Sequence, residues 1–130
     1  MKTIVLPDGE ILVMERFIYP YLVYSANLTT LYPKKIPVGY IYTLGAPEEY
    51  LHVFGFRKVI GLNEGVTTRI FGYSESLYST DTYQFDDYSK YVSDRFDPSA
   101  KAKRREEVFP QDCEKAFEMG KRLVQLQERT

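Results

Sequence analysis

The sequence predicts an α/β domain with a short, mostly parallel sheet. Helical and strand-like segments alternate through the middle of the chain, which is the pattern of α/β layering. Residues 36–43, "IPVGYIYT", are almost continuously apolar, as in a parallel strand that is covered on both faces. The chain has 130 residues and is 44% hydrophobic, so we expect one domain over residues 1–130 with one core.

Residues 3–13, "TIVLPDGEILV", are compatible with two structures. Pro-Asp-Gly between apolar runs is good hairpin chemistry. Alternatively, Thr3 to Leu6 form a buried strand, Asp8 caps a helix, and that helix runs from Glu10 to about Ile18. Short apolar runs do not distinguish these alternatives.

The next segment is an irregular, Tyr-rich stretch that leads to the strand at residues 36–43. Pro20 should end or kink any helix near Tyr19. After the strand, the loop Leu44 to Pro47 should pass into a helix whose first residue is Pro47. Two glutamates then follow at the positive end of that helix.

The second half of the chain predicts four further elements. A helical piece within residues 54–73 should close at Gly72, and residues 75–79 have the composition of a strand. A short helix capped by Asp86 and a charged helix from Pro98 should follow. The last helix is amphipathic, with Pro110 near its start. The residues expected close to its one apolar face are Cys113, Phe117, Leu123 and Val124.

The composition excludes several classes of protein. The formal net charge of −1 gives no field that would attract nucleic acid or an anionic membrane. The single cysteine, Cys113, excludes an internal disulfide and a cysteine-built metal or iron–sulfur site, and it fits a cytoplasmic protein. The apolar opening is interrupted at Pro7, Asp8 and Gly9, so we expect neither a signal peptide nor a membrane span.

Four blocks of the sequence resemble one protein family. They are "ERFIYPYLVY", "KKIPVGYIYT", "RIFGYSESLYSTDTYQFDDYSKYV" and "FDPSAKAKRREEVFPQDCEKAFEMGKRLV". Together they are similar to the carboxyl-terminal half of the flavodoxin-like flavoproteins, in the branch of NADPH-dependent FMN reductases and iron–sulfur flavoproteins. The similarity covers roughly residues 9–126. It implies a flavodoxin-like three-layer sandwich, FMN as cofactor and a nicotinamide nucleotide as electron donor.

The chain departs from this family at its amino-terminal end. The family begins with a Ser- and Gly-containing phosphate-binding loop between a strand and a helix, and no such block occurs here. We therefore expect a truncated flavodoxin-like fold. If Thr3 to Leu6 are a remnant of the family's third strand, three parallel strands result, the others being residues 36–43 and 75–79. Their open edge predicts a homo-oligomer, with or without exchange of elements.

The resemblance implies a cofactor site at the loop that follows the strand at residues 36–43. The residues that match the family's flavin-ring loop are Tyr42, Thr43, Leu44, Gly45 and Ala46. Gly45 would allow the backbone to approach the ring closely, and Tyr42 could stack or hydrogen-bond. The competing interpretation is an ordinary strand-to-helix connection. No residue is assigned a catalytic role.

For other polar and aromatic residues, a structural role is a simpler explanation than the binding of a ligand or a cation. Tyr78 and Tyr83 could line the same cleft, but core packing or an interface is the favoured role. Three aspartates could be read as a cation site, but helix capping and exposure to solvent explain them more simply. These aspartates are Asp81, Asp86 and Asp87.

His52 stands alone in the sequence, and Cys113 is expected to be a small buried hydrophobe. The basic run "KAKRREE", residues 101–107, predicts a solvated helix face with local ion pairs rather than a nucleic-acid site.

Three functional hypotheses follow. The chain is an FMN-dependent NAD(P)H oxidoreductase of the FMN reductase family, with flavin binding that is impaired or completed at a subunit interface. Alternatively, it is a non-catalytic oligomeric module of that family without flavin, or a fragment of a full-length flavoprotein.

Overall fold

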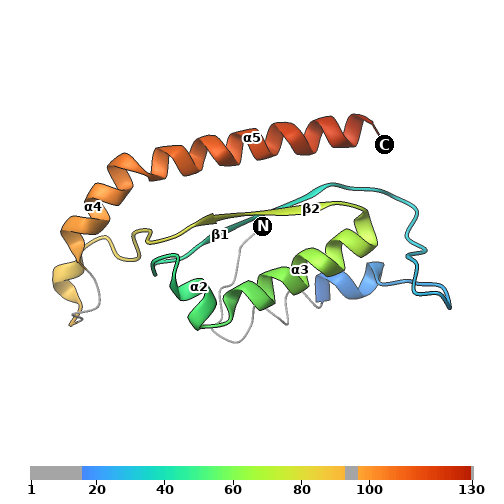
Figure 1. The fold of residues 1–130 in the computed structure, drawn as a ribbon, viewed down its shortest axis with the longest axis horizontal. Coiled ribbons are helices and arrows are strands. Elements are labelled where there is room, and N and C mark those ends of the chain that lie inside the picture. Colours follow the sequence, from blue (N-terminus) through green and yellow to red (C-terminus); the bar gives the residue numbers. More distant parts are fainter. Residues whose placement is uncertain (1–15, 93–96, 130) are drawn as a thin grey trace.

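The chain folds around two parallel strands that have helices on both sides (Figure 1). The computed structural model describes residues 16–92 and 97–129. Strand β1 (Val38–Thr43) pairs with β2 (Ser74–Ser79), in a register that runs from Val38 and Ser74 to Thr43 and Ser79. The two predicted strands at residues 36–43 and 75–79 are therefore confirmed. The third predicted strand, Thr3 to Leu6, and its hairpin alternative lie outside the described residues.

A helical stretch at residues 16–18 precedes the sheet and passes into the 3₁₀ turn η1 (Tyr19–Tyr21). Pro20 lies inside this turn, where it cannot donate the hydrogen bond that an α-helix would need. The prediction that the helix ends near Tyr19 is confirmed. The chain then crosses to β1 without regular structure, apart from an isolated bridge between Tyr24 and Thr30.

Two helices connect β1 to β2. Helix α2 (Tyr50–Val53) is short, because Gly55 adopts a positive φ of 72° before α3 (Phe56–Phe71) begins. Gly72, with a φ of 102°, ends α3 as predicted. The prediction that Pro47 is the first helical residue is wrong. Turns precede α2 instead, in which the Tyr50 N–H donates to the Pro47 carbonyl at 3.1 Å.

Within the described residues, three elements follow β2. Turn η2 (Tyr88–Lys90) is capped by Asp87, which accepts from the Ser89 N–H at 3.0 Å, so the predicted cap at Asp86 is wrong by one residue. Helix α4 (Pro98–Glu107) is capped by Asp97, and α5 (Phe109–Glu128) is the longest helix described. None of the helices in residues 16–92 and 97–129 is long and apolar enough to cross a bilayer.

Side chains of β1 alternate between the two faces of the sheet. Val38 packs against the buried cluster formed by Ile18, Ile70 and Phe71 on the α3 side. Gly39 faces α5, and a Cβ placed there would lie 2.7 Å from Leu123 Cδ1. The prediction that β1 is covered on both faces is wrong, because its side chains alternate between half-buried and exposed. Ile41, for example, is 56% exposed.

The sheet selects a different face of α5 from the one predicted. Cys113, Phe117 and Val124 are exposed, and Leu123 alone of the predicted set is half-buried. The buried residues are Asp112 and Met119. The reason is a polar contact, because the Asp112 carboxylate accepts from the Ser79 hydroxyl at 2.8 Å, which turns this side of the helix toward β2. The hydrophobic periodicity of the sequence carries no information about such a hydrogen bond, so it could not predict this orientation of α5.

Candidate functional site

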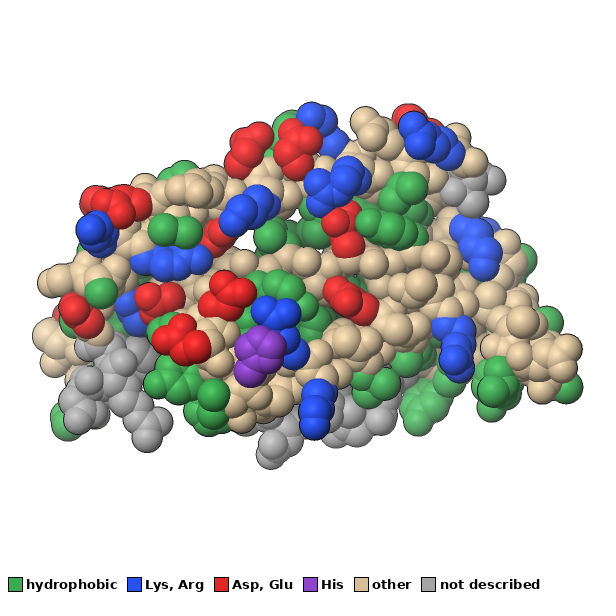
Figure 2. All heavy atoms as spheres, viewed as in Figure 1, with side chains coloured by type: hydrophobic (Ala, Val, Ile, Leu, Met, Phe, Trp, Pro, Cys, Tyr) green, Lys and Arg blue, Asp and Glu red, His purple; other side chains and the backbone are tan. Residues whose placement is uncertain are grey.

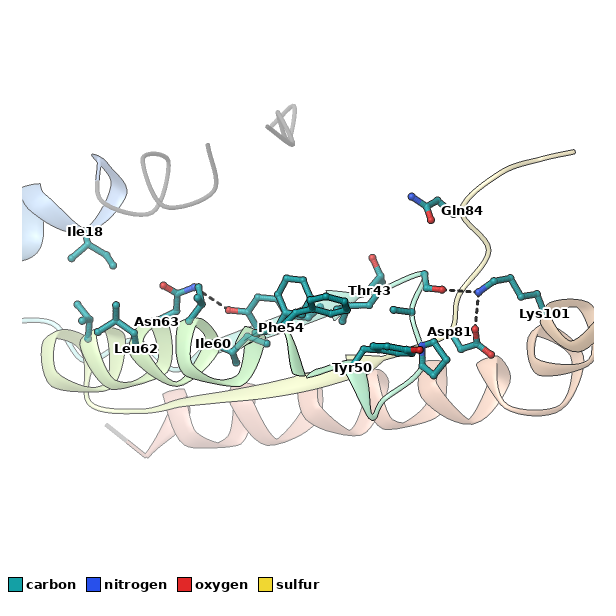
Figure 3. Close-up of a pocket in the computed structure, with 18 of the residues that line it drawn as sticks. Ile18, Thr43, Tyr50, Phe54, Ile60, Leu62, Asn63, Asp81, Gln84 and Lys101 are labelled. Carbon is teal, nitrogen blue, oxygen red and sulfur yellow. Dashed lines mark hydrogen bonds and ion pairs between the residues drawn. The ribbon is translucent and has the colours of Figure 1, made fainter. Parts of the chain in front are cut away.

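A pocket of about 1190 Å³ opens at the carboxyl ends of both strands (Figure 3). Thr43 and Ser79, the last residues of β1 and β2, lie opposite each other in the parallel register. In open α/β sheets this edge is where ligands bind. The five residues predicted from the sequence, which run from Tyr42 to Ala46, all line the pocket. The structure therefore brings the predicted site residues together in one cavity.

Hydrogen bonds hold the loops after the two strands side by side. The Leu44 N–H donates to the Ser79 carbonyl at 3.0 Å, which extends the ladder past the end of the sheet. The Thr82 N–H and hydroxyl both donate to the Leu44 carbonyl, at 2.9 and 3.0 Å. The Asp81 N–H donates to the Ala46 carbonyl at 2.8 Å. The pocket wall is thus a fixed pair of loops rather than two separate connections.

Lys101 on α4 anchors both loops from the pocket's outer end. Its ammonium group donates to the Gly45 carbonyl and to Asp81 Oδ1, each at 2.7 Å (Figure 3), and to the Thr82 carbonyl at 3.3 Å. The Lys101 side chain is only 3% exposed, so the charge is largely desolvated and depends on these partners. The interpretation of residues 101–107 as a wholly solvated face is therefore wrong for Lys101.

Tyr42 forms the inner wall of the pocket and belongs to a stack of three rings. Its ring lies 5.8 Å from that of Tyr40 and 6.1 Å from that of Tyr78, with interplanar angles of 18° in both pairs. The Tyr42 hydroxyl accepts from Asn63 Nδ2 at 3.3 Å (Figure 3). Burial raises the pKa of Tyr42, and the Asn63 hydrogen bond opposes this only in part. The hydroxyl therefore stays protonated near neutral pH.

Large apolar side chains line the rest of the pocket and remain accessible to solvent. Tyr50 and Phe54 stack with their ring centroids 5.5 Å apart. Phe54 and Leu62 are 63% and 66% exposed, and Val59 is 39% exposed. Contiguous exposed apolar surface in a concavity marks a site for a ligand or a partner. The pocket therefore offers apolar surface to a ligand or a partner.

The described lining of the pocket has few charged side chains, and more of these are acidic than basic. Among the described lining residues the charged ones are Asp81, Asp97 and Lys101. Asp97 caps α4 by accepting from the Ser99 N–H at 2.9 Å, while Lys101 and Asp81 form an ion pair. The phosphate of FMN does not fit this lining through a cation, because Lys101, the basic side chain among the described lining residues, is already bound to Asp81. Within the described residues no group of three or more His, Cys, Asp or Glu could hold a metal ion.

The tyrosines singled out beside the loop do not line the pocket. Tyr78 stacks on Tyr42, and the Arg57 guanidinium carbon lies 5.8 Å from the Tyr78 ring centroid. Tyr83 packs on Tyr88 at 5.7 Å between centroids and lies under Arg105. Both contacts agree with the favoured role in packing.

The structure also shows the positions of His52 and Cys113. His52, which has no second imidazole or cysteine close in sequence, is exposed on α2. Cys113 is exposed, so the expectation of a buried small hydrophobe is wrong, and the cause is the rotation of α5 described above.

Sequence reasoning missed a second buried charge cluster behind the pocket, centred on Asp112. Arg104 Nη2 donates to Asp112 Oδ2 at 2.7 Å, and Lys115 Nζ lies 3.3 Å from Oδ1. Burial raises the pKa of Asp112, but hydrogen bonds from Arg104, Ser79 and Lys115 outweigh burial and hold the pKa below its usual value. This cluster joins α4, α5 and the end of β2. The sequence signal is only an aspartate on an apolar helix face.

Comparison of the chain with protein-family models, with curated proteins and with solved structures finds no match. The functional argument therefore depends on the pocket, its lining and the resemblance of the four sequence blocks.

Proposed function

We propose that this chain is a flavodoxin-like protein of the FMN reductase type, whose pocket holds the isoalloxazine ring of a flavin. The observation that carries the proposal is the cavity at the carboxyl ends of β1 and β2, which contains all of the residues from Tyr42 to Ala46. When bound, a flavin would supply electron transfer with a nicotinamide nucleotide as donor. The chain's own residues would bind and orient the ring and exclude water from one of its faces.

The lining supports a planar aromatic ligand. Tyr50 and Phe54 already form a stacked pair at the pocket, with an interplanar angle of 18°. A third flat ring could extend that stack, and such contacts contribute about 0.5–1.5 kcal/mol beyond area burial. The Asn63 amide and the loop backbone beside Gly45 provide polar atoms that could fix the ring's orientation.

The same proposal covers the finer description of the fold. We infer a flavodoxin-like three-layer sandwich of which the described residues represent the carboxyl-terminal half. The parallel pairing of β1 with β2 and the positions of α3 and α5 on opposite sides of the sheet support this inference (Figure 1). The single cysteine supports a cytoplasmic location.

One observation favours a second candidate, an oligomeric module of the same ancestry that binds no flavin. FMN carries a phosphate dianion, and the described pocket lining has two carboxylates against one lysine. Lys101 donates to two carbonyls and to Asp81, so moving it to a phosphate would leave those acceptors without their donor. Loss of the flavin would leave the fold of α3, α4 and both strands unaffected.

The test is a fluorescence titration of the purified chain with riboflavin and with FMN. Stacking against the pocket rings should quench flavin emission in the micromolar range, since the ring is the part that fits. Absence of quenching by both ligands would contradict the flavin proposal and favour the second candidate.

A pocket-filling variant gives the titration its control. Val59→Trp places an indole in the pocket from α3 and should weaken flavin binding at least tenfold, equivalent to about 1.4 kcal/mol. Val53→Trp adds the same group on α2, where Val53 is 71% exposed and does not line the pocket, and it should leave binding unchanged. Equal effects of the two variants would assign the quenching to a different surface.

A further inference from the structure

Helix α5 carries a continuous apolar strip that the sheet does not cover. Phe117 and Val124 are 63% and 60% exposed, Phe109 is 40% exposed, and Cys113 is exposed. Their spacing of four, four and seven residues places them on one line along the helix. This strip, defined here as Phe109, Cys113, Phe117 and Val124, runs along most of the length of α5, a 20-residue helix.

The opposite side of α5 is polar, and its side chains make contacts within the chain. Arg122 donates to Glu75 on β2, with its Nη2 atom 2.8 Å from Glu75 Oε2. In the face drawn in Figure 2, acidic and basic side chains gather over the layer formed by α4 and α5. The apolar strip is therefore a distinct surface and not a general property of the helix.

A notch lies beside the largest exposed side chain of the strip. Gly120 has no heavy atom within 4 Å of the position that a Cβ would take, so the helix surface is open there. Phe117 lies three residues before Gly120, on the same side of the helix. A protruding ring next to an empty notch is a shape that can complement itself.

We propose that the strip is the contact surface for a second copy of this chain, with the two α5 helices antiparallel. A two-fold axis placed between Glu118 and Met119 sets Phe117 of each copy against the Gly120 notch of the other. The same axis sets Cys113 opposite Val124, so apolar residues meet over residues 113–124, while Phe109 lies opposite Glu128 at the end of the contact. A two-fold contact needs such self-complementarity.

The charges that border the strip fit the same arrangement. Glu114 and Lys121 lie on one edge of it, and the antiparallel register places Glu114 of one copy opposite residue 123 of the other, two residues from Lys121. Lys121 already lies over the Phe117 ring, with Nζ 5.6 Å from the ring centroid. In a parallel pair, this edge would instead face the opposite edge of the partner helix, so the pairing of Glu114 with Lys121 would be lost.

The mass of the full chain in solution tests the contact. Light scattering at micromolar concentration should give twice the 15.2 kDa of one chain. Phe117→Glu should give the single-chain mass, while Val53→Glu, at a 71% exposed position on α2, should leave the dimer intact. A monomeric wild-type chain, or a dimer that persists in Phe117→Glu, would overturn the proposal.

Filling the notch separates loss of contact from loss of folding. Gly120→Leu raises helix propensity, so the helix itself should become more stable while the dimer weakens at least tenfold. A helical circular dichroism signal that is retained while the dimer is lost supports the proposal. Unchanged dimerisation in this variant contradicts the packing of Phe117 against Gly120.

Oxidative cross-linking tests the antiparallel direction, because Cys113 is the sole cysteine. The two Cys113 residues of an antiparallel pair lie about 16 Å apart along the axis, too far for a disulfide. Val124→Cys should therefore create a cross-linked dimer under a mild oxidant, and the wild type should not. A disulfide-linked wild-type dimer would overturn the antiparallel arrangement.

Discussion

The face of the sheet that packs on α3 is held by rings and apolar chains, whereas the face that meets α5 combines the apolar side chains of Met119 and Leu123 at Gly39 with a buried carboxylate. On the α3 side, Phe71 is 3% exposed and contacts the rings of Tyr21 and Tyr32, each at 5.4 Å between centroids. On the α5 side, the buried carboxylate of Asp112 bonds to Ser79. Gly39 there allows Leu123 to approach the strand.

The two kinds of contact differ in how strictly they fix the position of one element against another. Apolar burial is roughly proportional to area and tolerates small shifts of one element over another. Buried hydrogen bonds to a charge have strict geometry and a high cost when one partner is missing. We therefore expect the α3 face to supply most of the stability and the α5 face to fix the orientation of α4 and α5.

The largest effect should come from Phe71→Ala. Removing this buried ring leaves a cavity among the rings of Phe17, Tyr21 and Tyr32 and should lower the free energy of unfolding by about 3–5 kcal/mol. Chemical denaturation followed by circular dichroism measures the change. Leu62→Ala on the same helix is the control, because Leu62 is 66% exposed and its loss should cost within about 0.5 kcal/mol. Similar losses in both variants would contradict the assignment of the core to this face.

The second effect should come from Asp112→Asn, which keeps the shape and removes the charge. The Arg104 and Lys115 contacts weaken, and the free energy of unfolding at neutral pH should fall by about 2 kcal/mol. The expected loss is smaller than that for Phe71→Ala because no cavity forms. Denaturation at neutral pH measures it.

The pH dependence of this variant identifies the cause. The folded pKa of Asp112 is lowered, so its carboxylate stabilises the fold above the unfolded pKa of about 3.9. This stabilisation is lost as the pH falls through the lower folded value. The difference between wild type and Asp112→Asn should therefore be full at pH 6 and shrink below about pH 4. A difference that is constant down to pH 2 would contradict the ionic origin.

The third effect should come from Gly39→Val. The new Cβ would lie 2.7 Å from Leu123 Cδ1 and 3.2 Å from Met119 Cε, so α5 must move or these side chains must shift. We expect a loss of about 1–2 kcal/mol. The double variant Gly39→Val with Leu123→Ala should recover part of it, since the shorter side chain makes room. Additive losses in the double variant would show that the two residues do not contact.

The smallest effect should come from Arg122→Gln. Its ion pair with Glu75 is on the surface, and such exposed pairs contribute little. The free energy of unfolding should stay within measurement error at moderate salt, in a denaturation experiment run beside Asp112→Asn. A loss as large as that of Asp112→Asn would mean that surface charge, and not burial, holds α5.

Much of the fold could be predicted from local patterns. The apolar run at residues 36–43 and the glycine at position 72 predicted β1 and the end of α3, since both signals depend on neighbouring residues alone. The face of α5 could not be predicted, because Cys113 and Phe117 are as apolar as the residues that the sheet covers. Asp112 turns the helix through a hydrogen bond to Ser79, which lies 33 residues away in the sequence.

The candidate site, like the fold, could be predicted from the sequence only in part. The sequence by itself predicted the loop from Tyr42 to Ala46, because these residues match the flavin-ring loop of the family that the four blocks resemble, and the apolar run before them marks the end of a strand. Only the tertiary structure decided that Lys101, in a run of charges, is buried between Gly45 and Asp81. Burial of a charge depends on partners that distant segments bring together, and these partners have no fixed spacing along the chain.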